Sequence, residues 1–131
     1  GGYADRAVFD SLRAVAALVF LGGFGWAAMA TDQPLAFALG LVVANAFGWG
    51  WPGLQHLSMA RRFPTATAAA SGISQTGVAA GLLIGPAALG LMVSTVGWSW
   101  GWLAAALSAF LGAAVVWLAA SRIPQNQAEP G

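Results

Sequence analysis

The chain has 131 residues, of which 59% are hydrophobic and only 7% are charged, and its net charge is +1. Soluble domains carry about 25% charged residues, so this chain cannot cover a soluble surface of its size. The composition predicts an all-α polytopic membrane protein, because lipid solvates apolar side chains. The lack of cysteine excludes disulfides and thiolate metal sites. The near-neutral charge argues against a nucleic-acid partner.

Four apolar stretches are each long enough to cross a bilayer, which takes about 20 residues. The predicted transmembrane helices cover residues 14–30, 35–59, 66–96 and 98–120. Together they form a four-helix membrane segment over residues 14–122. Residues 1–13 form a predicted cytoplasmic loop, and residues 123–131 form a predicted disordered cytoplasmic tail. No stretch alternates polar and apolar residues as the strands of a membrane barrel do.

The arginines predict the orientation of the chain in the membrane. The links between the helices are short, so neighbouring helices run antiparallel. All five arginines then fall on one side of the membrane, namely Arg6, Arg13, Arg61, Arg62 and Arg122. Positive residues are retained in the cytoplasm during insertion. We therefore expect a multi-pass protein of the cell membrane with a cytoplasmic C-terminus.

Polar residues divide the four stretches into two kinds. The first and fourth carry few hydrogen-bonding side chains apart from tryptophan and serine, and we expect them to face lipid. The second carries Asn45, Gln55 and His56, and the third carries Ser74 and Gln75. Amides in hydrocarbon are costly unless they are paired or hydrated. The second and third helices are therefore predicted to face protein or a water-filled cavity.

Pro52 lies inside the second stretch, between Gly50 and Gly53. Proline removes a backbone donor and clashes with the preceding turn, so this sequence predicts a local break in the helix. The break is compatible with two roles, a moving hinge or tight packing.

The third stretch contains Gly77-x-x-x-Gly81-x-x-x-Gly85, followed directly by Pro86. Glycines four residues apart lie on one helix face and let another backbone come close. Pro86 predicts a kink or a flexible point near Leu82–Pro86. Here too the sequence is compatible with a hinge and with tight packing.

Several motifs carry a family resemblance. Residues 1–6, Gly-Gly-Tyr-Ala-Asp-Arg, resemble the first half of a cytoplasmic loop motif, G-x-L-A-D-R-x-G-R-R, while residues 7–10 depart from its second half. Residues 60–64, Ala-Arg-Arg-Phe-Pro, followed by residues 70–77 resemble a link into helix eleven, and residues 81–90 are similar to a glycine–proline pattern of helices five and eleven. The chain thus resembles the last third of a major facilitator superfamily transporter, helices nine to twelve. Helices three to six are the alternative, because the two halves of that fold are pseudo-repeats.

The resemblance implies that the second stretch lines a central cavity and that the third flanks it. Candidate substrate contacts are then Asn45, Trp49, Gln75 and His56. Each has a structural alternative. Asn45 and Gln75 could hold helices together, Trp49 could pack against a neighbour, and His56 could relay protons or simply meet solvent near the inner interface.

The candidate gating or hinge residues are Asp5, Arg6, Pro52, Gly81, Gly85 and Pro86. Asp5 and Arg6 are expected to form a cytoplasmic gate or a contact with a helix end, since an aspartate stabilises a helix N-terminus.

The predicted function is the C-terminal part of a secondary transporter that moves a small solute by alternating access. Its expected partners are the lipid bilayer, the remaining helices of the full-length transporter and an unidentified small molecule. The alternative is a small four-helix membrane protein or accessory subunit without transport activity of its own. An enzyme is not expected, because no nucleophile–base constellation or carboxylate pair lies within a span. Neither a cofactor nor a metal is predicted.

Overall fold

The computed structural model describes residues 10–122, which are helical and contain no strand. The helices are α1 (Ser11–Met29), α2 (Pro34–Gly48), α3 (Pro52–Arg62), α4 (Thr67–Val96) and α5 (Trp98–Arg122). Because α2 and α3 follow each other closely, they form one interrupted span over Pro34–Arg62. Four spans are therefore long and apolar enough to cross a membrane. The prediction of an all-α, multi-pass membrane protein with four transmembrane helices is confirmed.

Local sequence sets the helix ends. The side chain of Asp10 caps α1, which begins at Ser11, three residues before the predicted start of the first span. Pro34 and Pro52 stand in the first turns of α2 and α3, where a missing N–H costs nothing. Gly97 has a φ of +95°, a conformation that favours glycine, and it reverses the chain between α4 and α5.

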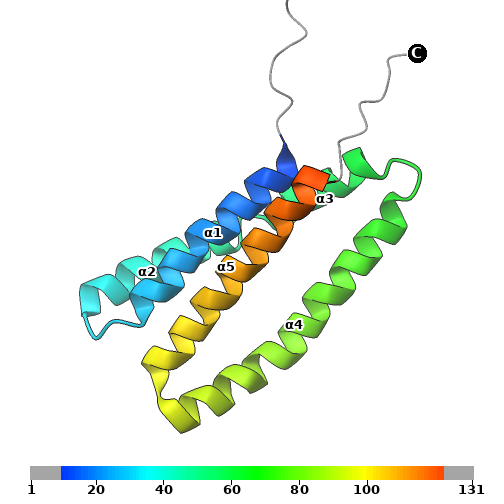
Figure 1. Ribbon diagram of the computed structural model, residues 1–131. Coiled ribbons are helices and arrows are strands. Elements are labelled where there is room, and N and C mark those ends of the chain that lie inside the picture. Colours follow the sequence, from blue (N-terminus) through cyan, green and yellow to red (C-terminus); the bar gives the residue numbers. More distant parts are fainter. Residues whose placement is uncertain (1–9, 123–131) are drawn as a thin grey trace, which may run out of the picture.

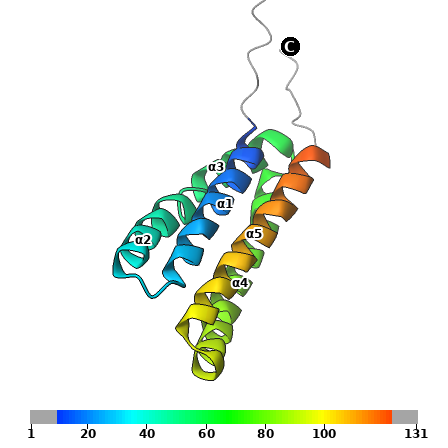
Figure 2. The same cartoon turned by 60° about the vertical axis from the view of Figure 1, so that its left-hand side comes forward.

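Helix α1 lies at the centre of the described chain, between α2 and α5 (Figure 1). It packs extensively against both and also contacts α3. Helix α4 contacts only α5 and α3 among the described helices, and none of its residues is buried. Figure 2 shows the same arrangement from another side, with α4 behind α5.

Small residues allow α1 and α2 to approach closely. A Cβ atom added to Gly25 would meet the backbone nitrogen of Ala44 and lie 2.6 Å from the carbonyl oxygen of Gly40. A Cβ atom on Gly22 would lie 3.0 Å from the Cα of Gly48. On α2, Gly40, Ala44 and Gly48 recur every four residues, which is the spacing of close helix crossings in membranes. The two backbones are therefore in direct contact.

This packing bears on the expectation that the first span faces lipid. Among the described residues α1 is the most buried of the four spans, while Phe20, Leu21 and Phe24 remain exposed. The prediction considered hydrogen-bonding side chains and overlooked the glycines of α1, which are its contact surface. The expectation that the third span faces protein or a cavity stays a prediction, because no described helix covers most of α4.

The two ends of the helix group differ in chemistry. The start of α1 and the ends of α3 and α5 lie at the same end in both views (Figures 1 and 2), and they carry Arg13, Arg61, Arg62 and Arg122. We call this the arginine end. At the opposite end, the Trp102 ring stacks on the rings of Trp26 and Trp98, with centroids 5.6 and 5.7 Å apart. Arg6 lies outside the described residues.

Candidate functional site

The second span is interrupted near its middle. Helix α2 ends with the Trp49 N–H donating to the Asn45 carbonyl at 3.2 Å, and α3 begins with the Gln55 N–H donating to the Trp51 carbonyl at 2.9 Å. Between them, Gly50 and Pro52 interrupt the regular helical bonds. The predicted break at Pro52 is therefore present. Non-helical backbone at membrane depth needs protein or water around it, because lipid cannot satisfy its polar groups.

Two side-chain contacts join α3 to α4. The Gln55 amide donates to the Ser74 hydroxyl, and the Nε2 atoms of Gln75 and His56 lie 3.2 Å apart. Gln55 and Ser74 are partly buried, whereas Gln75 and His56 are exposed. In the second contact one hydrogen lies between two nitrogens, so the histidine tautomer and the amide orientation are coupled. We call these four residues the α3–α4 polar contacts.

The four predicted substrate contacts separate into two sets. His56 and Gln75 are brought together across α3 and α4. Asn45 instead donates its Nδ2 hydrogen to the Leu41 carbonyl of its own helix at 2.8 Å. The Trp49 side chain is 64% exposed at the end of α2. Because α2 makes no contact with α4, Asn45 and Trp49 belong to a different surface from Gln75.

The predicted hinge residues of the third span lie in an uninterrupted helix. Helix α4 runs through Pro86 without a break from Thr67 to Val96. Cβ atoms added to Gly81 and Gly85 would meet no other atom within 4 Å among the described residues. Gly85 lines an open groove of about 440 Å³ between α4 and α5. A hinge or gating role for Gly81, Gly85, Pro86 and Pro52 stays a prediction.

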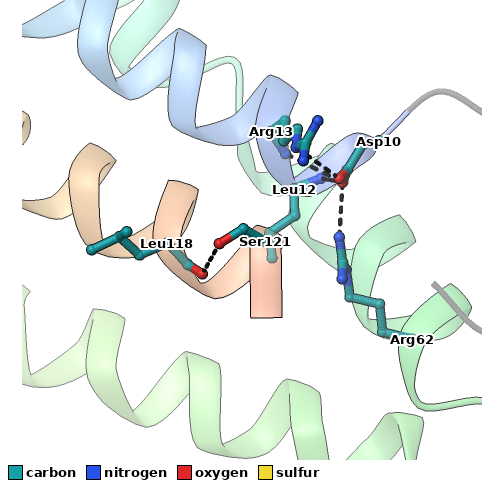
Figure 3. Close-up of polar contacts among 6 residues, drawn as sticks. All are labelled: Asp10, Leu12, Arg13, Arg62, Leu118 and Ser121. Carbon is teal, nitrogen blue, oxygen red and sulfur yellow. Dashed lines mark hydrogen bonds and ion pairs between the residues drawn. The ribbon is translucent and has the colours of Figure 1, made fainter. Parts of the chain in front are cut away.

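The predicted gate residues Asp5 and Arg6 lie outside the described residues. Asp10, the first residue that the structure describes, forms a polar cluster at the start of α1. Its carboxylate accepts hydrogen bonds from the backbone N–H groups of Leu12 and Arg13, which cap α1 (Figure 3). The same carboxylate accepts from Arg62 Nη2 at 2.8 Å and lies 3.4 Å from Arg13 Nε. Asp10 therefore ties the start of α1 to the end of α3.

Burial of Asp10 by itself would raise the pKa of its carboxyl group. The backbone N–H of Arg13 and the guanidinium of Arg62 stabilise the carboxylate, and together they hold the pKa below its ordinary value. Asp10 is therefore ionised at neutral pH and is shared between two arginines.

Arg62 is the buried member of this cluster, with a side chain only 1% exposed. Its Nε and Nη1 atoms have no partner within residues 10–122, and the buried hydroxyls of Ser11 and Ser58 have none there either. A buried arginine that loses its carboxylate is costly, so Asp10 is structurally important.

Sequence reasoning missed Asp10 as a structural residue. An aspartate directly before an apolar run is a known helix start signal, and it could have revealed the cap. The ion pair with Arg62 had no such signal, because the two residues are 52 positions apart.

Comparisons of the chain with protein-family models, with curated proteins and with solved structures find no match. Within residues 10–122 no three His, Asp or Glu side chains lie close enough together to hold a metal ion. Any function must therefore be argued from the membrane spans and their polar residues.

Proposed function

We propose that this chain is part of a secondary transporter of the major facilitator type, corresponding to helices nine to twelve, that moves a small solute by alternating access. The observation that carries the proposal is the interrupted span α2–α3, whose break lies about halfway through its 29 residues. Transporters place solute sites near the bilayer midplane, often at such discontinuous helices.

The polar residues beside the break support this proposal. The α3–α4 polar contacts bring amide, hydroxyl and imidazole groups together inside membrane-spanning helices. Such groups are rare in lipid and commonly face a bundle interior or a water-filled path. Gln75 and His56 are the proposed solute contacts, whereas Trp49 lies on a different surface.

The chemistry of the spans indicates the kind of solute. The four spans contain no aspartate or glutamate, since Asp10 and Asp32 lie just outside them. Proton coupling through a buried carboxylate would then need a residue outside this chain. The proposed contacts, an amide and an imidazole, are hydrogen-bonding groups, and they fit a solute with polar groups.

The proposed orientation places the arginine end in the cytoplasm. Arg13, Arg61, Arg62 and Arg122 stand at this end, while no arginine or lysine stands at the other among the described residues. Positive residues are retained on the cytoplasmic side. The C-terminus then lies in the cytoplasm, and the cell membrane is the proposed location.

Cysteine labelling tests the proposal, and these 131 residues contribute no native cysteine of their own. Gln75→Cys would be expressed in the full-length protein and treated with a membrane-impermeant maleimide from either side. A thiol reacts only when water lets it ionise, so labelling reports a water-filled path. We expect Gln75→Cys to react from both sides of the membrane, as alternating access requires.

Val115→Cys is the matched control. Gln75 lies eight residues from the start of α4 and Val115 seven residues from the end of α5, so both are about 10–12 Å below the arginine end. Val115 is 66% exposed on a helix predicted to face lipid, and its thiol should stay unlabelled. If both thiols are equally unreactive, Gln75 packs against protein or lipid. The alternative of a membrane protein without transport activity would then be favoured.

A further inference from the structure

An apolar groove runs between α1 and α5 on the outside of the helix pair. It encloses about 470 Å³. Four alanines make it hollow, Ala16 and Ala17 on α1 and Ala113 and Ala114 on α5. Because α1 and α5 pack along each other, the groove follows the helix axes.

Aromatic rings form the two ends of the groove. Phe20 and Phe110 lie at its deeper end, with ring centroids 5.2 Å apart. Trp117 lies toward the arginine end, seven residues further along α5, which is about 10 Å. The groove therefore runs along the axes of two membrane-spanning helices and is apolar, and both properties suit the part of a lipid acyl chain that lies next to the headgroup.

Two arginines stand where this groove approaches the arginine end. Arg13 lies one helical turn before Ala17, and its guanidinium carbon is 5.5 Å from the centroid of the Trp117 ring. Arg122 lies one turn after the groove residue Leu118, on the same face of α5. Long basic side chains at such positions extend to the headgroup level.

Within residues 10–122, the arginine end carries more arginines than carboxylates. Asp10 is shared between Arg13 and Arg62, so one carboxylate faces two guanidinium groups. Among the described residues of the arginine end, four arginines accompany one aspartate, a net charge of +3. Anionic headgroups are attracted to such basic clusters beside transmembrane helices.

We infer that the α1–α5 groove binds an anionic phospholipid, with one acyl chain on the alanines and the phosphate between Arg13 and Arg122. The apolar lining supplies affinity for any acyl chain. The two arginines supply the preference for an anionic headgroup over a zwitterionic one. This inference is independent of transport, because neither helix carries the proposed solute contacts.

Native mass spectrometry of the full chain in neutral detergent tests the inference. Dioleoyl phosphatidylglycerol and dioleoyl phosphatidylcholine, which share their acyl chains, would be added at equal concentrations. We expect phosphatidylglycerol to be retained about fivefold more strongly for each arginine engaged. Arg122→Gln should lower this preference about fivefold, because it removes one of the two charges.

Two matched controls separate a site from general attraction. Arg61→Gln makes the same charge change at the same end, on α3, which does not contact α5. It should leave the preference almost unchanged. Ala114→Leu fills the groove at an exposed position and should reduce retention of phosphatidylglycerol, whereas Ala79→Leu on the exposed surface of α4 should not.

Three results would overturn the inference. Equal retention of the two lipids would mean that the arginines do not favour an anionic headgroup over a zwitterionic one. Equal effects of Arg61→Gln and Arg122→Gln would mean that net charge acts without a site. Unchanged retention in Ala114→Leu would mean that lipid binds elsewhere.

Discussion

Helices α1 and α4 are both glycine-rich, yet they occupy opposite situations in the molecule. On α1, Gly22 and Gly25 lie against the backbone of α2, with no room for a Cβ atom at Gly25. On α4, Gly77, Gly81 and Gly85 have no neighbouring atom within 4 Å of their Cβ positions among the described residues. The regular spacing on α4 is compatible with tight packing, but among the described helices the close crossing is on α1.

The difference shows what glycine spacing can and cannot predict. A repeat of small residues every four positions makes a smooth face along a helix, and this lets another helix approach. It does not say which helix approaches, because that depends on how the spans are arranged. Helix α1 is held by α2 and α5, whereas α4 is held mainly where it meets α5 and at the α3–α4 polar contacts.

Substitution of the two kinds of glycine should give the largest contrast. Gly25→Ala places a Cβ atom 2.6 Å from the Gly40 carbonyl oxygen and even closer to the Ala44 backbone. Because backbone atoms must shift to relieve the overlap, we expect a loss of about 3–4 kcal/mol in the free energy of unfolding. Gly81→Ala meets open space and should be neutral, or stabilising by up to about 1 kcal/mol through helix propensity.

Unfolding of the full chain in mixed micelles, followed by circular dichroism, measures both variants. If Gly81→Ala destabilised the chain as much as Gly25→Ala, the glycines of α4 would be packed as closely as those of α1. That result would mean that α4 has a close partner, for example a second copy of the chain.

Removal of Asp10 should give the second largest effect, again on the α1 side. Asp10→Ala removes the cap of α1 and leaves Arg62 buried without its carboxylate. Breaking a buried ion pair costs about 3–5 kcal/mol, and we expect the lower end because Asp10 is 23% exposed. Asp32→Ala, in the exposed turn between α1 and α2, is the control and should change the same unfolding measurement very little.

The same pair predicts a pH dependence of stability that is smaller than the effect of Asp10→Ala. The pKa of Asp10 is lowered in the folded chain. Its contribution is therefore fully present above the ordinary aspartate pKa of about 3.9, and it is lost as pH falls through the lower folded value. Unfolding measured from about pH 6 to about pH 2 should show this loss in the native chain. Asp10→Asn should lose less stability over the same pH range. If the native chain and Asp10→Asn had the same pH profile of stability, Asp10 would not be its cause.

The fold could be predicted from the sequence because hydropathy and length act locally. Each apolar stretch identifies its own span, whatever the other spans do. The start of α1 is likewise set locally, because the side chain of Asp10 caps the helix at Ser11. Pro52 marked the interruption of the second span for the same reason, since proline acts on its own turn of helix.

The partners of the polar residues could be predicted only in part. Gln75 and His56 were both named as candidates, but nothing in the sequence indicated that they meet. Asn45 shares the polarity of Gln75 and yet bonds within its own helix. Partner choice depends on the rotation and separation of whole helices, and those follow from glycine and alanine packing along α1, α2 and α5.

The smallest predicted effect concerns the side-chain hydrogen bond between α3 and α4. Gln55→Ala removes the bond to the Ser74 hydroxyl, and hydrogen bonds between membrane helices contribute about 0.6 kcal/mol on average. The loss should be no larger than this, because Gln55 Oε1 is buried without a partner in residues 10–122 and its removal relieves a desolvated oxygen. Asn45→Ala is the control, since within residues 10–122 its amide bonds to the Leu41 carbonyl of its own helix and to no other helix. If Gln55→Ala instead matched Asp10→Ala in the unfolding measurement, α4 would be anchored as firmly as α1, and the contrast between the two helices would not hold.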